Sequence, residues 1–207
     1  SKNNFTFKEW QKIKKFKKEK LITFYKRFIK NYLSLNKKYL FNKELSKKYI
    51  FNQIKEVDIK KNYGLKLLPV GIKDNINTKF LTTDYGLRSK KKFNVGNNAN
   101  IVDKIINKGG LIFSKTNCAE YAVHYISDKL NVNPHNNKFI AGTSSTGSAI
   151  AVSCGALPVA IGTQTAGSII RPASFCGVYG FKPTFGSIDR TGILKNNDLF
   201  DTVGIIS

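Results

Sequence analysis

Apolar and polar positions follow two different patterns along the chain. Between residues 5 and 63, aromatic and aliphatic residues recur every three or four positions, as at Trp10, Ile13 and Phe16. This period predicts amphipathic helices that bury one face against a core. Two asparagines, Asn36 and Asn42, are expected to interrupt these helices.

From residue 64 onward the pattern changes to short, continuous apolar runs. The runs 65–72 and 156–161 are typical of short strands that are buried on both faces. Both patterns together predict an α/β fold, in which helices flank a mixed sheet and residues 5–63 form a helical N-terminal layer. No internal repeat and no Gly/Ser-rich linker divides the chain.

Further elements are expected between these runs. We predict an exposed loop at 77–92, a helix at 100–108 that Gly109 and Gly110 terminate, a strand at 111–113, and a turn at 115–117.

The stretch 141–184 differs most from the rest of the chain, because Arg171 and Lys182 are its only charged residues. Ser and Thr gather in it twice, at 142–148 and 162–168, on either side of the run 156–161. A strand, a tight turn of small residues and a hydroxyl are how several folds present a nucleophile. Glycine and alanine at such a turn also let backbone N–H groups approach a ligand. The alternative interpretation is that these serines only cap the helices that follow them.

Lys73 ends the apolar run 65–72, and a buried lysine must either find a partner or lose its charge. The alternative is a solvated lysine at the end of a strand. His124 and His135 stand in no Ser-His-Asp order and have no cysteine or acid at metal-ligand spacing. A serine nucleophile without a histidine needs another base, and lysine is the usual substitute.

These residues resemble the amidase signature family, whose members cleave amide bonds with a Ser–Ser–Lys triad. The similarity extends over residues 66–207, through the blocks 68–76, 109–122 and 141–184, with Ser144 and Ser168 at the family's spacing of 24 residues. It implies the catalytic residues Lys73, Ser144 and Ser168, an oxyanion hole built from backbone N–H groups of Thr165, Ala166 and Gly167, and a non-proline cis peptide at Ser144.

The resemblance also implies a general function. We expect an amide hydrolase that forms a serine acyl-enzyme on a small-molecule amide, with no metal and no cofactor. Gln164 stands where the family usually has Asp, Ala166 stands at a glycine position, and Arg171 comes one residue late. These departures favour the general amidase branch over the glutamine-hydrolysing subunit of tRNA-dependent amidotransferases, which stays the alternative.

The domain expectation is a basic helical segment at 1–63, followed by an amidase signature domain at 64–207 that is truncated at its C-terminus. Because family members are much longer than this chain, we expect an N-terminal fragment that holds all three catalytic positions. Whether such a fragment is active alone, or forms a homodimer, stays open.

Charge and cysteine content narrow the possible partners and the compartment. The net charge is +22, and 19 of the 35 basic residues fall in residues 1–61. Asparagine is enriched as well, which adds nothing to phosphate binding and favours compositional drift over a nucleic-acid surface. A basic nucleic-acid-binding module with an amidase-like core is therefore the less favoured third interpretation. Three widely spaced cysteines and no secretory leader predict a cytoplasmic protein.

Overall fold

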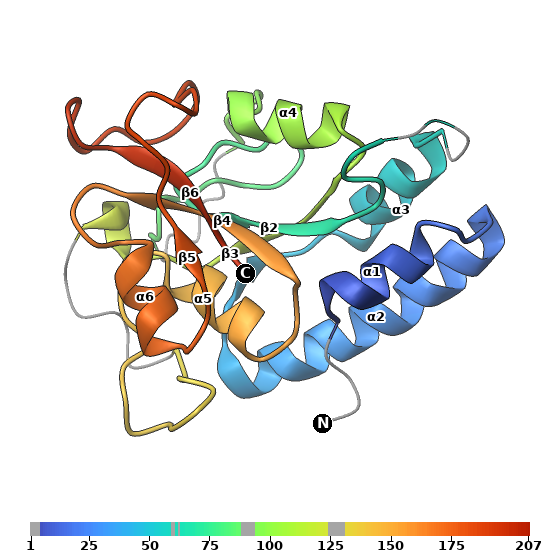
Figure 1. Ribbon diagram of the computed structural model, residues 1–207, viewed down its shortest axis with the longest axis horizontal. Helices are drawn as coiled ribbons and strands as arrows, with labels where there is room; N and C mark the ends of the chain where they lie inside the picture. The colour runs from blue at the N-terminus through green and yellow to red at the C-terminus, as the bar shows by residue number, and fades with distance from the viewer. Residues whose placement is uncertain (1–4, 59–60, 62, 88–93, 124–130) are drawn as a thin grey trace.

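The computed structural model describes residues 5–58, 61, 63–87, 94–123 and 131–207. A six-stranded mixed sheet forms its centre, with strand order β1-β3-β2-β4-β6-β5 (Figure 1). The strands are β1 (Asn42–Glu44), β2 (Pro69–Lys73), β3 (Leu111–Thr116), β4 (Val159–Gln164), β5 (Gly180–Phe181) and β6 (Thr202–Ile206). The helices are α1 (Phe7–Ile13), α2 (Lys18–Tyr39), α3 (Lys47–Glu56), α4 (Asn100–Asn107), α5 (Thr146–Ser153) and α6 (Ile170–Phe175), with a 3₁₀ turn at Glu120–Ala122.

The three central strands, β3, β2 and β4, are parallel, and every residue in them is buried. Complete burial explains why their sequences are continuous apolar runs rather than alternating ones. The strands β1 and β6 flank this core in antiparallel orientation, and β5 adds an outer antiparallel strand. The α/β fold with a mixed sheet is therefore confirmed.

Helices cover the sheet on both sides: in Figure 1, α4 lies above it, and α1, α2 and α5 lie below it. The apolar stripe of α2 meets the sheet through aromatic rings, since Phe28 and Tyr32 each lie 5.0 Å from the ring of Phe113. The hydroxyl of Tyr25 donates to the carbonyl of Leu67, and the indole of Trp10 donates to that of Lys66 at 2.8 Å. These contacts confirm the expected helical layer at the N-terminus.

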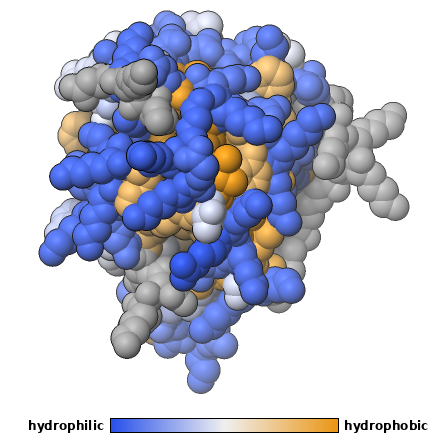
Figure 2. Space-filling model, turned by 90° about the vertical axis from the view of Figure 1, so that its right-hand side faces the viewer, coloured by the Kyte–Doolittle hydropathy of each residue, from blue (hydrophilic) through white to orange (hydrophobic). Residues whose placement is uncertain are grey.

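The outward face of this layer is strongly basic. Figure 2 shows the right-hand side of Figure 1, where hydrophilic side chains surround a few hydrophobic ones. A groove of about 590 Å³ runs between α2 and α3, lined by Lys26, Ile29, Lys30, Leu33, Ser34, Lys37, Lys47 and Phe51. The helical period of the sequence thus separates aromatic residues, which pack inward, from lysines, which face solvent.

Two details of the N-terminal region differ from the sequence-based expectation. The helix α2 continues through Asn36 and ends at Tyr39, and Leu40 then adopts the left-handed conformation. The side chain of Asn36 accepts the N–H of Asn42 at 2.8 Å, so it fastens the turn after the helix instead of breaking the helix. Asn42 opens β1, which pairs with β3. Three residues are too few for a periodic pattern to reveal a strand.

Two expectations about the middle of the chain need correction. The strand β3 includes Lys115 and Thr116, which the sequence pattern places in a turn and which are in fact fully buried. The segment 77–87 has no regular structure but buries Thr78, Leu81 and Thr83, so it is not an exposed loop; 88–92 fall outside the described residues. The helix α4 ends as expected, with Gly109 at a φ of 78°. Among the described helices, none is long and apolar enough to cross a membrane.

Candidate active site

Lys73 is the last residue of β2, and its side chain is completely buried. Its amine donates to Ser144 Oγ at 2.7 Å, to Thr163 Oγ1 at 2.8 Å and to the Thr163 carbonyl at 3.2 Å. All three partners are uncharged, and no ion pair joins this amine to a carboxylate in the described part of the chain. Burial lowers the pKa of Lys73 from 10.5 to about 8, because desolvation disfavours the charged form.

Ser144 lies in the loop that leads into α5, and the Thr143–Ser144 peptide bond is cis, as the family resemblance implied. The guanidinium of Arg171 donates to the carbonyl of Thr143 through Nε at 3.1 Å and Nη2 at 2.9 Å. The Ser144 carbonyl accepts the N–H of Ala119 at 3.2 Å. Contacts on both sides of Ser144 therefore hold its hydroxyl toward Lys73.

Ser168 lies in the turn between β4 and α6, where it is 7% exposed. The Ser145 N–H donates to the Ser168 carbonyl at 3.2 Å, which joins the two serine-bearing segments. No hydrogen bond connects the Ser144 and Ser168 hydroxyls in the described structure. The fold thus brings Lys73 and Ser144 into direct contact and ties Ser168 to them through the backbone.

Helix capping does not explain the serine clusters. Ser145 precedes α5 without a side-chain capping bond, and its hydroxyl donates to the Thr163 carbonyl at 3.2 Å. The residue that caps α6 is Gln164, whose Oε1 accepts the N–H groups of Ile169 at 2.8 Å and Ile170 at 3.0 Å. Both Ser144 and Ser168 are therefore free of a capping role.

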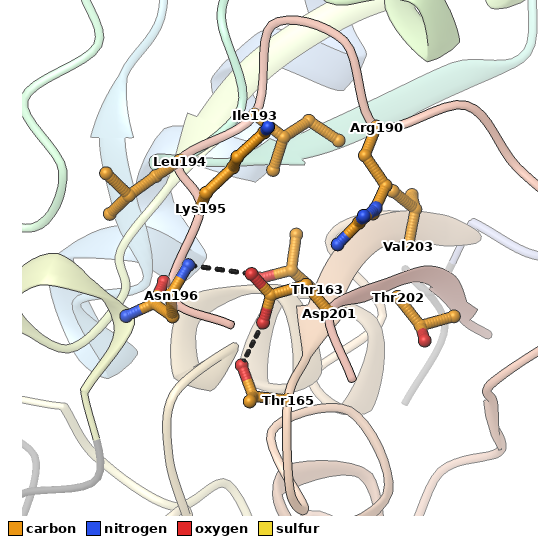
Figure 3. A pocket seen from close by; sticks show the side chains of 10 residues that line it. All are labelled: Thr163, Thr165, Arg190, Ile193, Leu194, Lys195, Asn196, Asp201, Thr202 and Val203. Carbon is orange, nitrogen blue, oxygen red and sulfur yellow. Dashed lines mark hydrogen bonds between the residues drawn. The ribbon is translucent and has the colours of Figure 1, made fainter. Parts of the chain in front are cut away.

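The turn after β4 presents backbone N–H groups. Those of Ala166, Gly167 and Ser168 donate to no protein acceptor in the described part of the chain. The side chain of Thr165 fixes the start of this turn, because its hydroxyl donates to Asp201 Oδ1 at 2.5 Å (Figure 3). Unpaired N–H groups beside a buried serine form a site that can hold an oxyanion.

Three residues complete the site that sequence reasoning did not single out. Thr163 shares its hydroxyl between Lys73 and Asn75, whose amide donates to it at 2.9 Å. Asp201 accepts the backbone N–H groups of Asn196 and Asn197 as well as the Thr165 hydroxyl, beside a cavity of about 10 Å³ (Figure 3). Thr163 lies in the 162–168 cluster, which was the only sequence signal for it; Asn75 and Asp201 gave none.

The histidines contribute nothing to this site as far as the structure describes them. The ring of His135 contacts the Cys176 carbonyl at 2.8 Å and Ser153 Oγ at 3.3 Å, whereas His124 falls outside the described residues. No three His, Cys, Asp or Glu side chains gather at metal-binding distance among the residues described.

Comparison with known proteins places this fold and site in one family. The family model described as Amidase matches residues 22–207. The chain therefore belongs to the amidase family, and the match begins inside α2 rather than at residue 64 or 66.

Individual relatives agree with the family. The chain is 37% identical over 172 residues to a protein from Natranaerobius thermophilus that is named as the A chain of a glutamyl-tRNA(Gln) amidotransferase. Among solved structures, it resembles an amidase family protein from Bacillus anthracis, with a TM-score of 0.83 and 29% identity over 99% of this chain and 44% of the other. The corresponding amidotransferase component from Thermotoga maritima gives a TM-score of 0.72 and 29% identity, over 86% of this chain and 39% of the other.

The match covers only part of these relatives. The alignment with the Natranaerobius protein spans 79% of this chain but 35% of the relative. The chain thus corresponds to about a third of the curated relative's length.

Proposed function

We propose that this chain carries the acyl-transfer site of an enzyme that hydrolyses carboxamide C–N bonds. Ser168 is the nucleophile, Ser144 is the proton relay, and Lys73 is the general base. The observation that carries the proposal is the wholly buried amine of Lys73, 2.7 Å from the hydroxyl of Ser144 and surrounded by uncharged partners. Family membership supports amide hydrolysis as the general chemistry.

The proposed reaction begins with neutral Lys73. Its amine accepts the proton of the Ser144 hydroxyl, which in turn accepts the proton of Ser168 as that oxygen attacks the amide carbonyl. Collapse of the tetrahedral intermediate breaks the C–N bond, and Ser144 returns a proton to the leaving nitrogen. Water then hydrolyses the acyl-serine along the same proton path.

Backbone N–H groups supply the stabilisation of the negative charge in this proposal. The carbonyl oxygen becomes an oxyanion, and the N–H groups of Thr165, Ala166, Gly167 and Ser168 are the donors offered to it. Removing one such donor typically costs about 3 kcal/mol of transition-state stabilisation. The free N–H groups after β4 support this assignment.

Covalent labelling tests the roles of the three residues. In the protein that contains this chain, a fluorophosphonate should label Ser168, and Ser168→Ala should abolish labelling. Lys73→Ala should reduce the labelling rate at pH 7 by several orders of magnitude, and Ser144→Ala should slow it less. The losses should not add in double variants, because the three groups act as one unit.

Ser174→Ala is the matched control, since Ser174 is an exposed serine in α6, six residues beyond Ser168. It should label like the parent protein. Labelling that persists in Ser168→Ala, or that is unchanged in Lys73→Ala, would refute the assignment.

A second candidate is the glutamine-hydrolysing component of a tRNA-dependent amidotransferase. It is favoured by the curated relatives, which bear the amidotransferase name at 37% and 38% identity. Glutamine and simple carboxamides separate the candidates. Ammonia release from glutamine that depends on added partner proteins favours the amidotransferase, and turnover of simple amides by the isolated protein favours a general amidase.

A further inference from the structure

A second lysine is buried at the same end of the sheet as Lys73. Lys115 is completely buried in β3, next to β2. Its amine donates to the carbonyl of Ile76 and to Thr83 Oγ1 at 3.0 Å, and lies 3.9 Å from Asp74 Oδ1. Asp74 is also completely buried and directly follows Lys73 in the chain. The proposed reaction uses neither Lys115 nor Asp74.

Strand register separates the two lysines. Lys115 pairs with Ile72, and Thr116 pairs with Lys73, in the parallel ladder of β2 and β3. Side chains alternate between the faces of a sheet, so Lys115 points to the face opposite that of Lys73. The Asp74 N–H continues this ladder to the Thr116 carbonyl at 3.1 Å, which places the Asp74 side chain on the same face as Lys115.

The carboxylate of Asp74 is fixed in this position. Its Oδ2 accepts the N–H of Gly86 at 3.0 Å, and its Oδ1 accepts that of Asp84 at 3.4 Å. On this face Lys115 balances Asp74, and Lys43 pairs with Asp84 at 3.0 Å. The other face holds Lys73 with hydroxyl, carbonyl and amide groups only. Charge is thus compensated on one face and uncompensated on the other.

We propose, on the basis of the function proposed above, that Lys115 is a positioning residue that engages the Asp74 carboxylate on the far face of the sheet. It thereby denies Lys73 a counter-ion. A carboxylate that paired with Lys73 would stabilise the ammonium form, which cannot accept a proton. The unpaired amine instead gives up its proton readily and serves as base.

Other ionisable groups near the two amines do not change this picture. Burial lowers the pKa of Lys115 to about 8, and the Asp74 carboxylate opposes that shift most, followed by the thiol of Cys118 and by Glu44 and Asp84. For Lys73, only Cys118 and Asp201 oppose the shift. The pKa of the Cys118 thiol is raised to about 12, so this group is uncharged near neutrality. Asp201 is occupied by Thr165, Asn196 and Asn197.

The test compares pH profiles of Ser168 labelling by a fluorophosphonate. Lys115→Gln removes the charge but keeps a donor for the Ile76 carbonyl, and it leaves the Asp74 carboxylate uncompensated. The labelling profile should then move to higher pH by about one unit, and the rate at pH 7 should fall about tenfold. Adding Asp74→Asn to Lys115→Gln should return the profile to that of the parent protein.

A purely structural role predicts a different result. Loss of packing would lower the labelling rate at every pH without moving the profile, and the double variant would not recover. Either result would overturn the proposal. Absence of labelling in the parent protein would instead refute the proposed function, so the two failures are distinguishable.

A second measurement needs no variant. In the parent protein with isotope-labelled lysine side chains, NMR can follow both buried amines through a pH titration. Lys73 should lose its proton at lower pH than Lys115. Deprotonation of Lys115 first would overturn the proposal even if every substituted protein failed to fold.

Discussion

At the residue scale, the properties of Lys73 that suit it to catalysis oppose stability. The folded chain buries an amine whose pKa falls from 10.5 to about 8, whereas the unfolded chain hydrates it. Below pH 8 the folded state must therefore accommodate a desolvated cation with uncharged partners. Such groups persist where function depends on them.

The first prediction is that Lys73→Met raises stability while it abolishes Ser168 labelling. Methionine has a similar length and no charge to desolvate, so the free energy of unfolding at pH 7 should rise by about 2–3 kcal/mol. Urea unfolding followed by circular dichroism measures this change. A variant less stable than the parent protein would show that the hydrogen bonds of the amine outweigh its desolvation.

The second prediction concerns the pH dependence of stability. Lys73 and Lys115 both have a lower pKa in the folded state, so between about pH 8 and 10.5 the unfolded chain binds more protons and stability rises with pH. Buried thiols act in the opposite direction above pH 9, since the pKa of Cys118 is raised from 9 to about 12. The free energy of unfolding should therefore rise between pH 8 and 9, and less so in Lys73→Met. A flat or falling curve in the parent protein would contradict this.

Sequence reasoning identifies the three catalytic candidates but not their surroundings. Lys73 is visible because it ends an apolar run, and Ser144 and Ser168 because they lie in clusters at family spacing. Thr163 and Asp201 reach the site through tertiary contacts between segments that are distant in sequence. The pattern puts Lys115 in a turn because a lysine after three apolar residues resembles a strand end, and only strand pairing shows that it is buried.

At the element scale, α6 begins where the family pattern departs from its usual form. Gln164 caps the two N–H groups at its start, so it satisfies donors that would otherwise lack partners. The same cap spans the turn 165–168, which bears the nucleophile and the free N–H groups. An amide oxygen accepts these bonds as a carboxylate would, which explains how the chain tolerates glutamine there.

The third prediction is that Gln164→Ala destabilises this turn. Loss of the cap should lower the free energy of unfolding by about 1 kcal/mol and slow Ser168 labelling severalfold. Gln164→Glu keeps both acceptor oxygens and is the matched control, with stability close to that of the parent protein. Equal effects of the two substitutions would argue against a capping role.

The fourth prediction concerns the start of α5, where Gly147 passes close to two other segments. A Cβ at this position would collide with the Asn117 N–H and the Phe41 carbonyl. Gly147→Ala should therefore destabilise the chain by about 2–4 kcal/mol, as overpacking against a fixed backbone does. Gly64→Ala is the control, because nothing lies within 4 Å of its added methyl group. Similar unfolding midpoints for the two variants would refute this account.

Long elements are the easiest to predict from the sequence. The helices α2 and α4 and the strands β2 and β4 are indicated by sustained periodicity or continuous apolar runs. The two-residue β5 and the three-residue β1 depend on their partner strands, so no local pattern could reveal them. The same limit applies to strand order, which is set by long-range pairing.

At the scale of the whole molecule, the β5 edge of the sheet leaves aromatic residues exposed. Tyr179 is 86% exposed and Phe181 is 61% exposed, and Ile205 lies opposite Phe181 in the β5–β6 pair. Partner residues of an antiparallel pair share one face, so these three side chains form a continuous apolar patch. Exposed patches of this kind mark surfaces that another polypeptide covers.

The fifth prediction is that this 207-residue chain, produced alone, self-associates through the β5 edge. Sedimentation velocity should show a mass that rises with concentration, and the dye ANS should bind. Replacing Tyr179 and Phe181 with serine should reduce both effects without lowering stability, since neither side chain is buried. Phe80→Ser is the control, because Phe80 is 58% exposed but packs beside Tyr49 of α3, at a different part of the surface. If the Phe80 variant reduced association as much as the β5 variant, the attraction would come from general surface hydrophobicity and not from the sheet edge.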